Sequence, residues 1–280
     1  MNKKVVIFVA ICYSISILAA VIFHYCVGSY NSALGGVFAT AYMFIPLISV
    51  VITQLICRER VFAGCGFSMK INRWWFVAGP AIIVITMLAV LLSALMPGVG
   101  LTVETEAMQA YVDTFAKAGL TLSPTVIIIF LLVAALLAGY TLNAVISIGE
   151  EGAWRGFLSY SLDEMGFFRR SLVIGAVWGF WHAPLILMGH NYPSHPVIGV
   201  FMMALLCILM APIFLYFREK SGSMIVAAIA HGTLNATAGM ALVLLSGYNE
   251  LTCGMAGVAG MIVLAIADLF LFWRNSVLLK

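Results

Sequence analysis

Three groups of polar residues interrupt long apolar stretches of the sequence, and their residue types suit hydrolytic chemistry. In chain order they are Glu150, Glu151 and Arg155; Trp178 and His182; and His231 and Asn235. A spacing of four recurs within the groups, and residues four apart share one face of an α-helix. We therefore expect each group to project from one helix toward its neighbours.

The two adjacent glutamates are expected to have different environments. On a helix, Glu151 and Arg155 lie on one face and can form an ion pair. Glu150 lies about 100° further around the helix axis, so its carboxylate is left without that partner. Asn143, seven residues earlier, falls on nearly the same face as Glu150. Glu150 is thus the candidate base or ligand, although a charge cluster capping a transmembrane helix would also explain this group.

The two histidines and Asn235 admit a structural explanation as well as a chemical one. His182 lies about 16 Å into its predicted helix, near the midplane, where a polar ring needs a partner. His231 and Asn235 are also typical of an interhelical hydrogen-bonded pair. If they converge with Glu150, a Glu and a His can activate water while a His and an Asn stabilise an oxyanion. Glu150, His182 and His231 can equally hold Zn²⁺ with a position open for water, and the spacing does not distinguish these routes.

The elements that must position these groups are transmembrane helices. Hydrophobic residues make up 64% of the 280, charged residues 9%, and the mean hydropathy is +1.11. A soluble domain is about half apolar and about a quarter charged. Eight apolar runs are long enough to cross a bilayer as helices. They are Val5–Gly28, Gly36–Ile56, Trp75–Met96, Pro124–Ile148, Ser171–Met188, Val197–Phe217, Met224–Leu245 and Gly254–Trp273.

The predicted fold is therefore an all-α polytopic membrane protein, with residues 1–280 forming a single transmembrane domain. The first run is expected to be a retained helix, because it is long for a signal peptide and no clear cleavage site follows it. The six cysteines are scattered and form no CxxC, which favours small apolar core residues. No basic stripe, P-loop or dinucleotide fingerprint occurs, so no nucleic-acid partner is expected.

The basic residues predict the orientation in the membrane. With eight spans and the N-terminus inside, Lys117 alone of the 14 Lys and Arg residues falls in an outer loop. Such an asymmetry follows the positive-inside rule and places both termini in the cytoplasm. The fourth predicted helix ends on the inner side, and the fifth and seventh begin there. We therefore expect the polar groups to converge in a membrane cavity that faces the cytoplasm.

The three groups, in this order, resemble the motifs of a known family. Its motifs are EExxxR, here Glu150, Glu151 and Arg155; aromatic-xxx-His, here Trp178 and His182; and HxxxN, here His231 and Asn235. The family is the CPBP family, which comprises type II CAAX prenyl endopeptidases and related bacteriocin-processing and Abi proteins. The resemblance covers a motif-bearing core at about 124–245, whereas the first three predicted helices match only in hydropathy. Trp178 departs from the pattern, which usually has Phe there, and we expect altered packing rather than lost chemistry.

The resemblance implies an intramembrane endopeptidase with a defined set of site residues. The catalytic residues would be Glu150 and His182, which activate water, and His231 and Asn235, which stabilise the oxyanion. Glu151 and Arg155 would brace the site. Members are often described as metalloproteases, but a metal-free glutamate mechanism also fits the residues and is preferred. No cofactor is then required, while Zn²⁺ held by Glu150, His182 and His231 is the open alternative.

The expected substrate is a membrane-associated or prenylated peptide or protein that enters from the lipid bilayer. The compact loops and the MNKK start favour a bacterial inner membrane. Two alternatives stay open from the sequence. One is a bacteriocin immunity or scaffold membrane protein without protease activity. The other is a transporter that uses the same polar groups as an ion relay.

Overall fold

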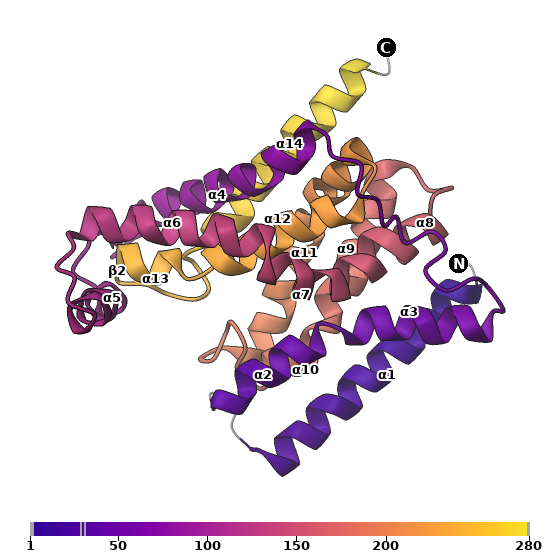
Figure 1. Ribbon diagram of the computed structural model, residues 1–280, viewed down its shortest axis with the longest axis horizontal. Helices are drawn as coiled ribbons and strands as arrows, with labels where there is room; N and C mark the ends of the chain where they lie inside the picture. The colour runs from indigo at the N-terminus through magenta and orange to yellow at the C-terminus, as the bar shows by residue number, and fades with distance from the viewer. Residues whose placement is uncertain (1–2, 29, 31, 279–280) are drawn as a thin grey trace.

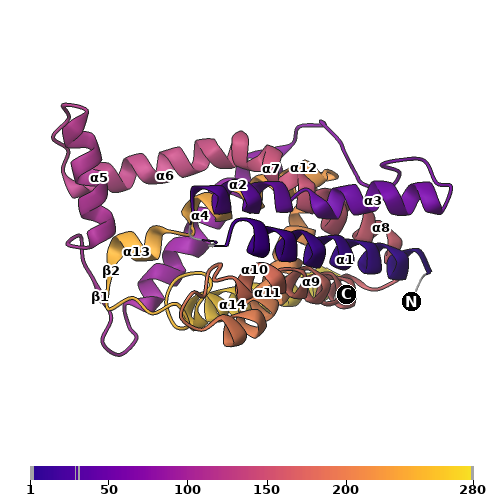
Figure 2. The same ribbon diagram turned by 90° about the horizontal axis from the view of Figure 1, so that it is seen from below.

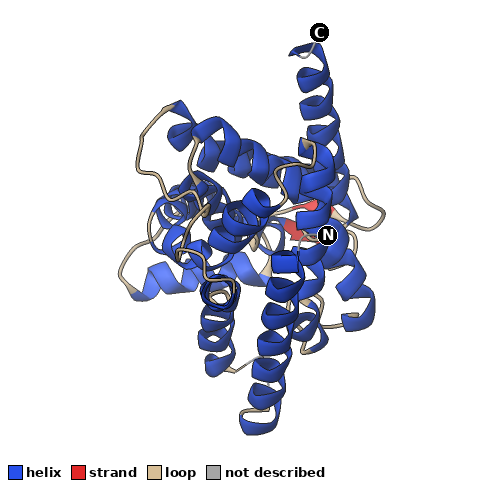
Figure 3. Ribbon diagram, turned by 90° about the vertical axis from the view of Figure 1, so that its right-hand side faces the viewer, coloured by secondary structure: helices blue, strands red, loops and turns tan. Residues whose placement is uncertain are grey.

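Helices account for nearly all the regular structure of the computed structural model, which describes residues 3–28, 30 and 32–278, with side chains to 274 (Figures 1 and 3). The first part of the chain forms α1 (Lys3–Cys26), α2 (Ala33–Tyr42), α3 (Ile45–Ile56), α4 (Arg73–Ser93), β1 (Gly100–Leu101), α5 (Glu106–Lys117), α6 (Pro124–Tyr140) and α7 (Leu142–Glu151). It continues as the π-helix η1 (Gly152–Leu158), α8 (Ser159–Ser161), α9 (Phe167–Trp181), α10 (Ala183–Leu187), α11 (Pro196–Ser221), α12 (Met224–Thr237), α13 (Met240–Leu244), β2 (Leu245–Ser246) and α14 (Val258–Leu278).

Many of these helices are long and apolar enough to cross a membrane. Six helical segments of the described chain meet this condition, and the bent pair of α6 with α7–α8 makes a seventh. Large apolar side chains such as Leu18 and Leu269 are more than half exposed on the outside, where lipid would cover them. The prediction of an all-α integral membrane protein is confirmed. The eighth predicted run corresponds to α14, which is not among these segments, so the count of eight and the cytoplasmic termini stay predictions.

The predicted fourth helix is broken near its middle. We expected one helix over Pro124–Ile148, but α6 and α7 meet at an angle of 50°. The break lies at Thr141, whose φ of −124° and ψ of −105° are not helical. Its Oγ1 donates to the carbonyl of Leu137 at 2.7 Å, a back-bond that often bends helices. Beyond the break the chain stays helical through Ser161, as expected for the segment that carries both glutamates.

The loops gather at two opposite ends of the bundle (Figures 1 and 2). At one end, which we call the basic end, Lys4 pairs with Glu59 at 3.2 Å and Arg170 pairs with Glu219. At the other end, β1 pairs with β2 in an antiparallel ladder beside α5. Loops that the charge distribution assigns to the same side therefore do lie together.

The core that carries the polar groups is built from α7, α9, α11 and α12. α9 crosses α11 closely, because a Cβ on Gly179 would lie 2.5 Å from the Cα of Ala204. Small residues at such crossings let transmembrane helices approach and pack by van der Waals contact. On the other side, Asn143 of α7 donates from Nδ2 to the carbonyl of Gly232 in α12 at 3.1 Å. These contacts place α9 against α11 and α7 against α12.

Candidate active site

Glu150 lies near the end of α7 and is only 2% exposed. Its Oε2 accepts two hydrogen bonds, from Nε1 of Trp178 at 2.6 Å and from Nε1 of Trp154 at 3.3 Å. Its Oε1 accepts none from the described residues, and Glu150 lines an internal cavity. Both donors are neutral indoles, so the carboxylate is oriented without being paired to a cation.

Glu151 has the opposite environment, as the helical spacing predicted. Its Oε1 accepts from Nη1 of Arg155 at 2.9 Å and from Nδ1 of His231 at 2.8 Å. The side chains of Glu151 and Arg155 are fully buried. The guanidinium of Arg155 also lies 4.3 Å from the centre of the Trp178 ring. This buried group therefore ties η1 to α9 and α12.

The segment after the glutamates is a π-helix, in which every residue from 152 to 158 is buried. Its glycines allow close contact with neighbouring backbone, since a Cβ on Gly156 would lie 2.6 Å from the carbonyl oxygen of Cys65. π-Helical turns are rare and recur at functional sites. Here the turn carries both Trp154 and Arg155 into the interior, one toward each glutamate.

His182 lies at the junction of α9 and α10, and Pro184 lies in the first turn of α10. Its Nδ1 lies 3.0 Å from the carbonyl oxygen of Trp178. A carbonyl can only accept, so Nδ1 carries the proton and Nε2 is left as the basic nitrogen of the neutral ring. The Nε2 atom makes no hydrogen bond to the described residues, and the ring lines the cavity.

His231 and Asn235 project from α12 into the same cavity. Because Nδ1 of His231 donates to Glu151, its Nε2 is the nitrogen left for a ligand. Asn235, one turn further along, is exposed within the described structure. The two side chains thus share a face, as their spacing predicted.

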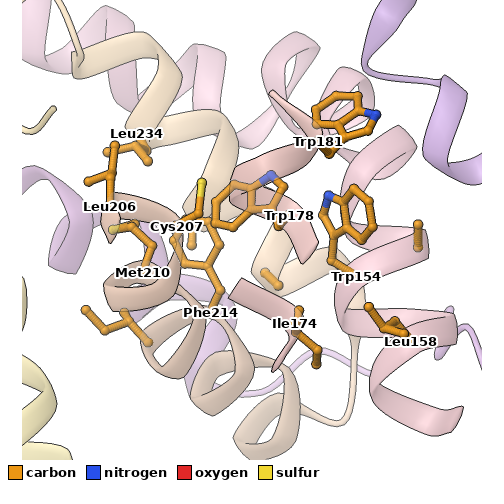
Figure 4. Close-up of a cluster of buried hydrophobic side chains, with 14 of the residues drawn as sticks. Trp154, Leu158, Ile174, Trp178, Trp181, Leu206, Cys207, Met210, Phe214 and Leu234 are labelled. Atoms are coloured by element: carbon orange, nitrogen blue, oxygen red, sulfur yellow. The ribbon is translucent and has the colours of Figure 1, made fainter. Parts of the chain in front are cut away.

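All four candidate catalytic residues line one cavity of about 520 Å³. Trp178 lines it too, whereas Glu151 and Arg155 lie behind its wall. Figure 4 shows Trp178 between Trp154 and Phe214 in the cluster of buried side chains beside the cavity. The expected convergence is therefore present, and the site is buried rather than a solvated charge cluster.

The cavity extends from Glu150 toward the loops 189–195 and 246–257. Exposed Asn191 and Tyr248 lie at that end, which is opposite the basic end. If the basic end is cytoplasmic, as the charge distribution predicts, this end of the cavity faces away from the cytoplasm. The cytoplasmic termini and the cytoplasm-facing cavity are therefore separate predictions from the sequence, and both stay predictions.

Residues 124–237 match the model of a protein family described as type II CAAX prenyl endopeptidase Rce1-like. Over this segment the chain is similar to the Rce1-like family. The segment contains all three motifs, and the match confirms the resemblance inferred from them. It supports an intramembrane CAAX-type protease. Comparison with curated proteins found no match.

The polar groups of the Rce1-like segment do not fit the zinc site that the sequence left open. Among the described residues, no group of three or more His, Cys, Asp and Glu side chains is arranged to hold a metal ion. The described side chains of the cavity therefore lack a ligand set for Zn²⁺.

Sequence reasoning missed three residues around the cavity. Trp154 lies inside the EExxxR motif of the Rce1-like segment, and its spacing of four from Glu150 was a usable signal. Glu250 accepts from Nδ1 of His195 at 2.9 Å at the loop end of the cavity. His190 contacts the hydroxyl of Tyr30 at 2.8 Å, and burial lowers its pKa to about 4. These loop residues show no helical periodicity that would have indicated their position.

Proposed function

We propose that the chain is an intramembrane endopeptidase in which Glu150 activates water for peptide-bond hydrolysis. The observation that carries this proposal is that Glu150, His182 and His231 line one cavity. Among the described residues, their hydrogen bonds engage Oε2 of Glu150 and Nδ1 of each histidine, which leaves Oε1 of Glu150 and Nε2 of each histidine for substrate and water. A buried carboxylate and a neutral imidazole near one water are suited to general base catalysis.

The proposed reaction has two proton transfers, one before and one after the addition of hydroxide to the peptide carbonyl carbon. Oε1 of Glu150 takes a proton from a water that Nε2 of His182 helps to orient, and the hydroxide adds to the peptide carbonyl carbon. Glu150 then returns the proton to the peptide nitrogen as the carbon–nitrogen bond breaks. The products are a carboxylic acid and an amine, and the carboxylate is restored. No metal or cofactor enters this scheme.

The oxyanion formed by the addition needs hydrogen-bond donors. Asn235 can donate from its amide, and His231 can donate from Nε2 when both of its nitrogens carry protons. Glu151 fixes the ring of His231 through the 2.8 Å contact to Nδ1. Arg155 in turn fixes Glu151, so these two residues act through His231 and do not contact the substrate.

A lipid-anchored peptide suits the walls of this cavity. Apart from the polar groups named above, it is lined by apolar side chains such as Leu206, Met210 and Leu242. Leu242 is 49% exposed, so the apolar lining reaches the surface of the molecule. We therefore propose a prenylated or otherwise membrane-associated peptide as substrate, and a bacterial inner membrane as the location.

The proposal is tested with purified protein reconstituted in lipid vesicles. Peptides ending in a farnesylated cysteine and three further residues are offered beside the same peptides without the lipid, and products are identified by mass spectrometry. We expect cleavage of the farnesylated peptide and its loss in Glu150→Gln. The matched control is Glu106→Gln, which alters an exposed carboxylate of α5 and should retain activity. Cleavage by Glu150→Gln at the wild-type rate would refute the proposal.

A further inference from the structure

Trp178 contacts both residues that the proposed mechanism assigns to the water. Its Nε1–H donates to Oε2 of Glu150 at 2.6 Å, and its main-chain carbonyl accepts from Nδ1 of His182 at 3.0 Å. One residue therefore joins the glutamate of α7 to the histidine at the end of α9. We propose that Trp178, assisted by Trp154, is a positioning residue that selects Oε1 of Glu150 as the reacting oxygen. This inference rests on the proposed function.

The two hydrogen bonds to Glu150 engage only one of its carboxylate oxygens. Both indole donors bind the same oxygen, Oε2, at 2.6 and 3.3 Å. The lone pairs of Oε2 are then engaged, and rotation of the carboxylate would break both bonds. Oε1 has no such donor among the described residues and belongs to a residue that lines the cavity. The proton from water is therefore directed to Oε1.

Both donors to Glu150 are indole N–H groups, whose chemistry suits them to hold a base. An indole N–H donates and does not accept, and it carries no charge. It can therefore hold the carboxylate without taking up the proton and without pairing the base with a cation. Glu151 differs in both respects, because it binds the guanidinium of Arg155 and a titratable ring nitrogen of His231. The different partners thus leave Glu150 able to act as a base, whereas Glu151 fixes the positions of Arg155 and His231.

The Trp178 ring is buried and held in place by its neighbours. The side chain is 3% exposed, with the guanidinium of Arg155 4.3 Å from its centre and the Phe214 ring 5.9 Å away (Figure 4). The next residue, Gly179, packs its backbone directly on α11. In Figure 4 the indole nitrogens of Trp154 and Trp178 lie on the facing sides of the two rings. The ring is thereby held where its N–H meets Glu150.

The kinetic test removes the donor and keeps the ring. Trp178→Phe retains the aromatic wall and the carbonyl that binds His182, but has no N–H. We expect kcat for the farnesylated peptide to fall about 10- to 100-fold, with KM changed by less than about twofold. Trp154→Phe should have a smaller effect, since its bond is longer. Trp75→Phe is the control, because its indole donates to the carbonyl of Lys70, far from the cavity.

A second readout needs neither substrate nor turnover. In protein labelled with ¹⁵N-tryptophan, the indole N–H signals of Trp178 and Trp154 are assigned from the two Phe variants. Both should move in Glu150→Gln, where a neutral amide replaces the carboxylate, while the Trp75 signal stays in place. If Trp178→Phe does not fold, the Trp178 signal is assigned by exclusion, from Phe variants of the other five tryptophans. Unmoved Trp178 and Trp154 signals in Glu150→Gln would overturn the inference.

The two proposals fail in different ways. An inactive Glu150→Gln together with a Trp178→Phe protein of wild-type kcat would overturn the positioning role and leave the protease intact. An active Glu150→Gln protein would overturn the protease mechanism itself. Reduced kcat in Trp178→Phe, with moved indole signals in Glu150→Gln, supports the role of Trp178.

Discussion

At the scale of single residues, the site depends on which partner each polar side chain has. Glu150 and Glu151 are neighbours in sequence, yet neutral indoles bind one while an arginine and a histidine bind the other. Helical geometry predicted this division, because adjacent residues point in different directions. It did not predict the indole donors, since the three-dimensional position of Trp178 depends on how α9 packs.

Removing the carboxylate of Glu151 should destabilise the protein as well as inactivate it. In Glu151→Gln the guanidinium of Arg155 stays fully buried without its counter-ion. An uncompensated buried charge costs about 3–5 kcal/mol. We expect a clear fall in the melting temperature in detergent. The control is Glu59→Gln, which breaks a partly exposed pair with Lys4 and should cost less than about 1 kcal/mol. Equal melting temperatures for the two variants would contradict the role of Glu151.

His190 should make the protein less stable in acid. Burial lowers its pKa from 6.5 to about 4, so the folded protein binds fewer protons than the unfolded chain between these values. The stabilising contribution is complete above about pH 6.5 and is lost progressively as the pH falls toward about 4. In His190→Gln the melting temperature should fall less between pH 7 and pH 5 than in wild type. The exposed His24 gives the control variant, His24→Gln. An unchanged pH dependence in His190→Gln would count against this account.

At the scale of elements, the positions of the motif-bearing polar residues depend on how helices cross and on where they are irregular. The sequence predicted that the motifs lie on helices that meet, because apolar length and four-residue spacing are local properties. It missed the break at Thr141 and the π-helix η1, since a reading with 3.6 residues per turn assumes uninterrupted α-helix. It also missed Glu250 and His190, whose positions depend on contacts between loops distant in sequence.

The close crossing of α9 on α11 should not accept a larger residue. In Gly179→Ala the new methyl group would meet the backbone of Ala204 at 2.5 Å, so the helices must separate. Overpacking of this kind costs about 1–3 kcal/mol, and the displacement of α9 would also move His182. We expect a lower melting temperature and reduced cleavage. Gly36→Ala, where a Cβ would meet nothing within 4 Å, should leave both unchanged. A fully active and stable Gly179→Ala protein would show that the crossing is looser than described.

At the scale of the whole molecule, the two ends of the bundle differ in charge and in access to the cavity. The basic end carries the Lys4–Glu59 and Arg170–Glu219 pairs, and the cavity extends toward the other end. The charge asymmetry between the two ends, and the orientation it implies, stay predictions from the sequence. The sequence could not indicate the direction of the cavity, because that depends on how the loops 189–195 and 246–257 pack.

Membrane orientation can be measured with cysteines introduced at the two ends. Glu104→Cys lies in the loop before α5, and Lys70→Cys lies in the loop at the basic end. In intact cells a membrane-impermeant thiol reagent should label Glu104→Cys, and it should label Lys70→Cys only after permeabilisation. Both cysteines are introduced into a variant in which the natural cysteines are replaced by serine. The reverse labelling pattern would place the basic end outside.

The central claim is that Glu150 activates water without a metal ion, and its most direct test is one rate comparison. Cleavage of the farnesylated peptide is measured for wild type and Glu150→Gln, each with and without a chelator. We expect wild-type activity to be insensitive to the chelator and activity of Glu150→Gln to fall at least about 100-fold. Wild-type activity that is lost in chelator and restored by zinc, or a fully active Glu150→Gln protein, would contradict the account.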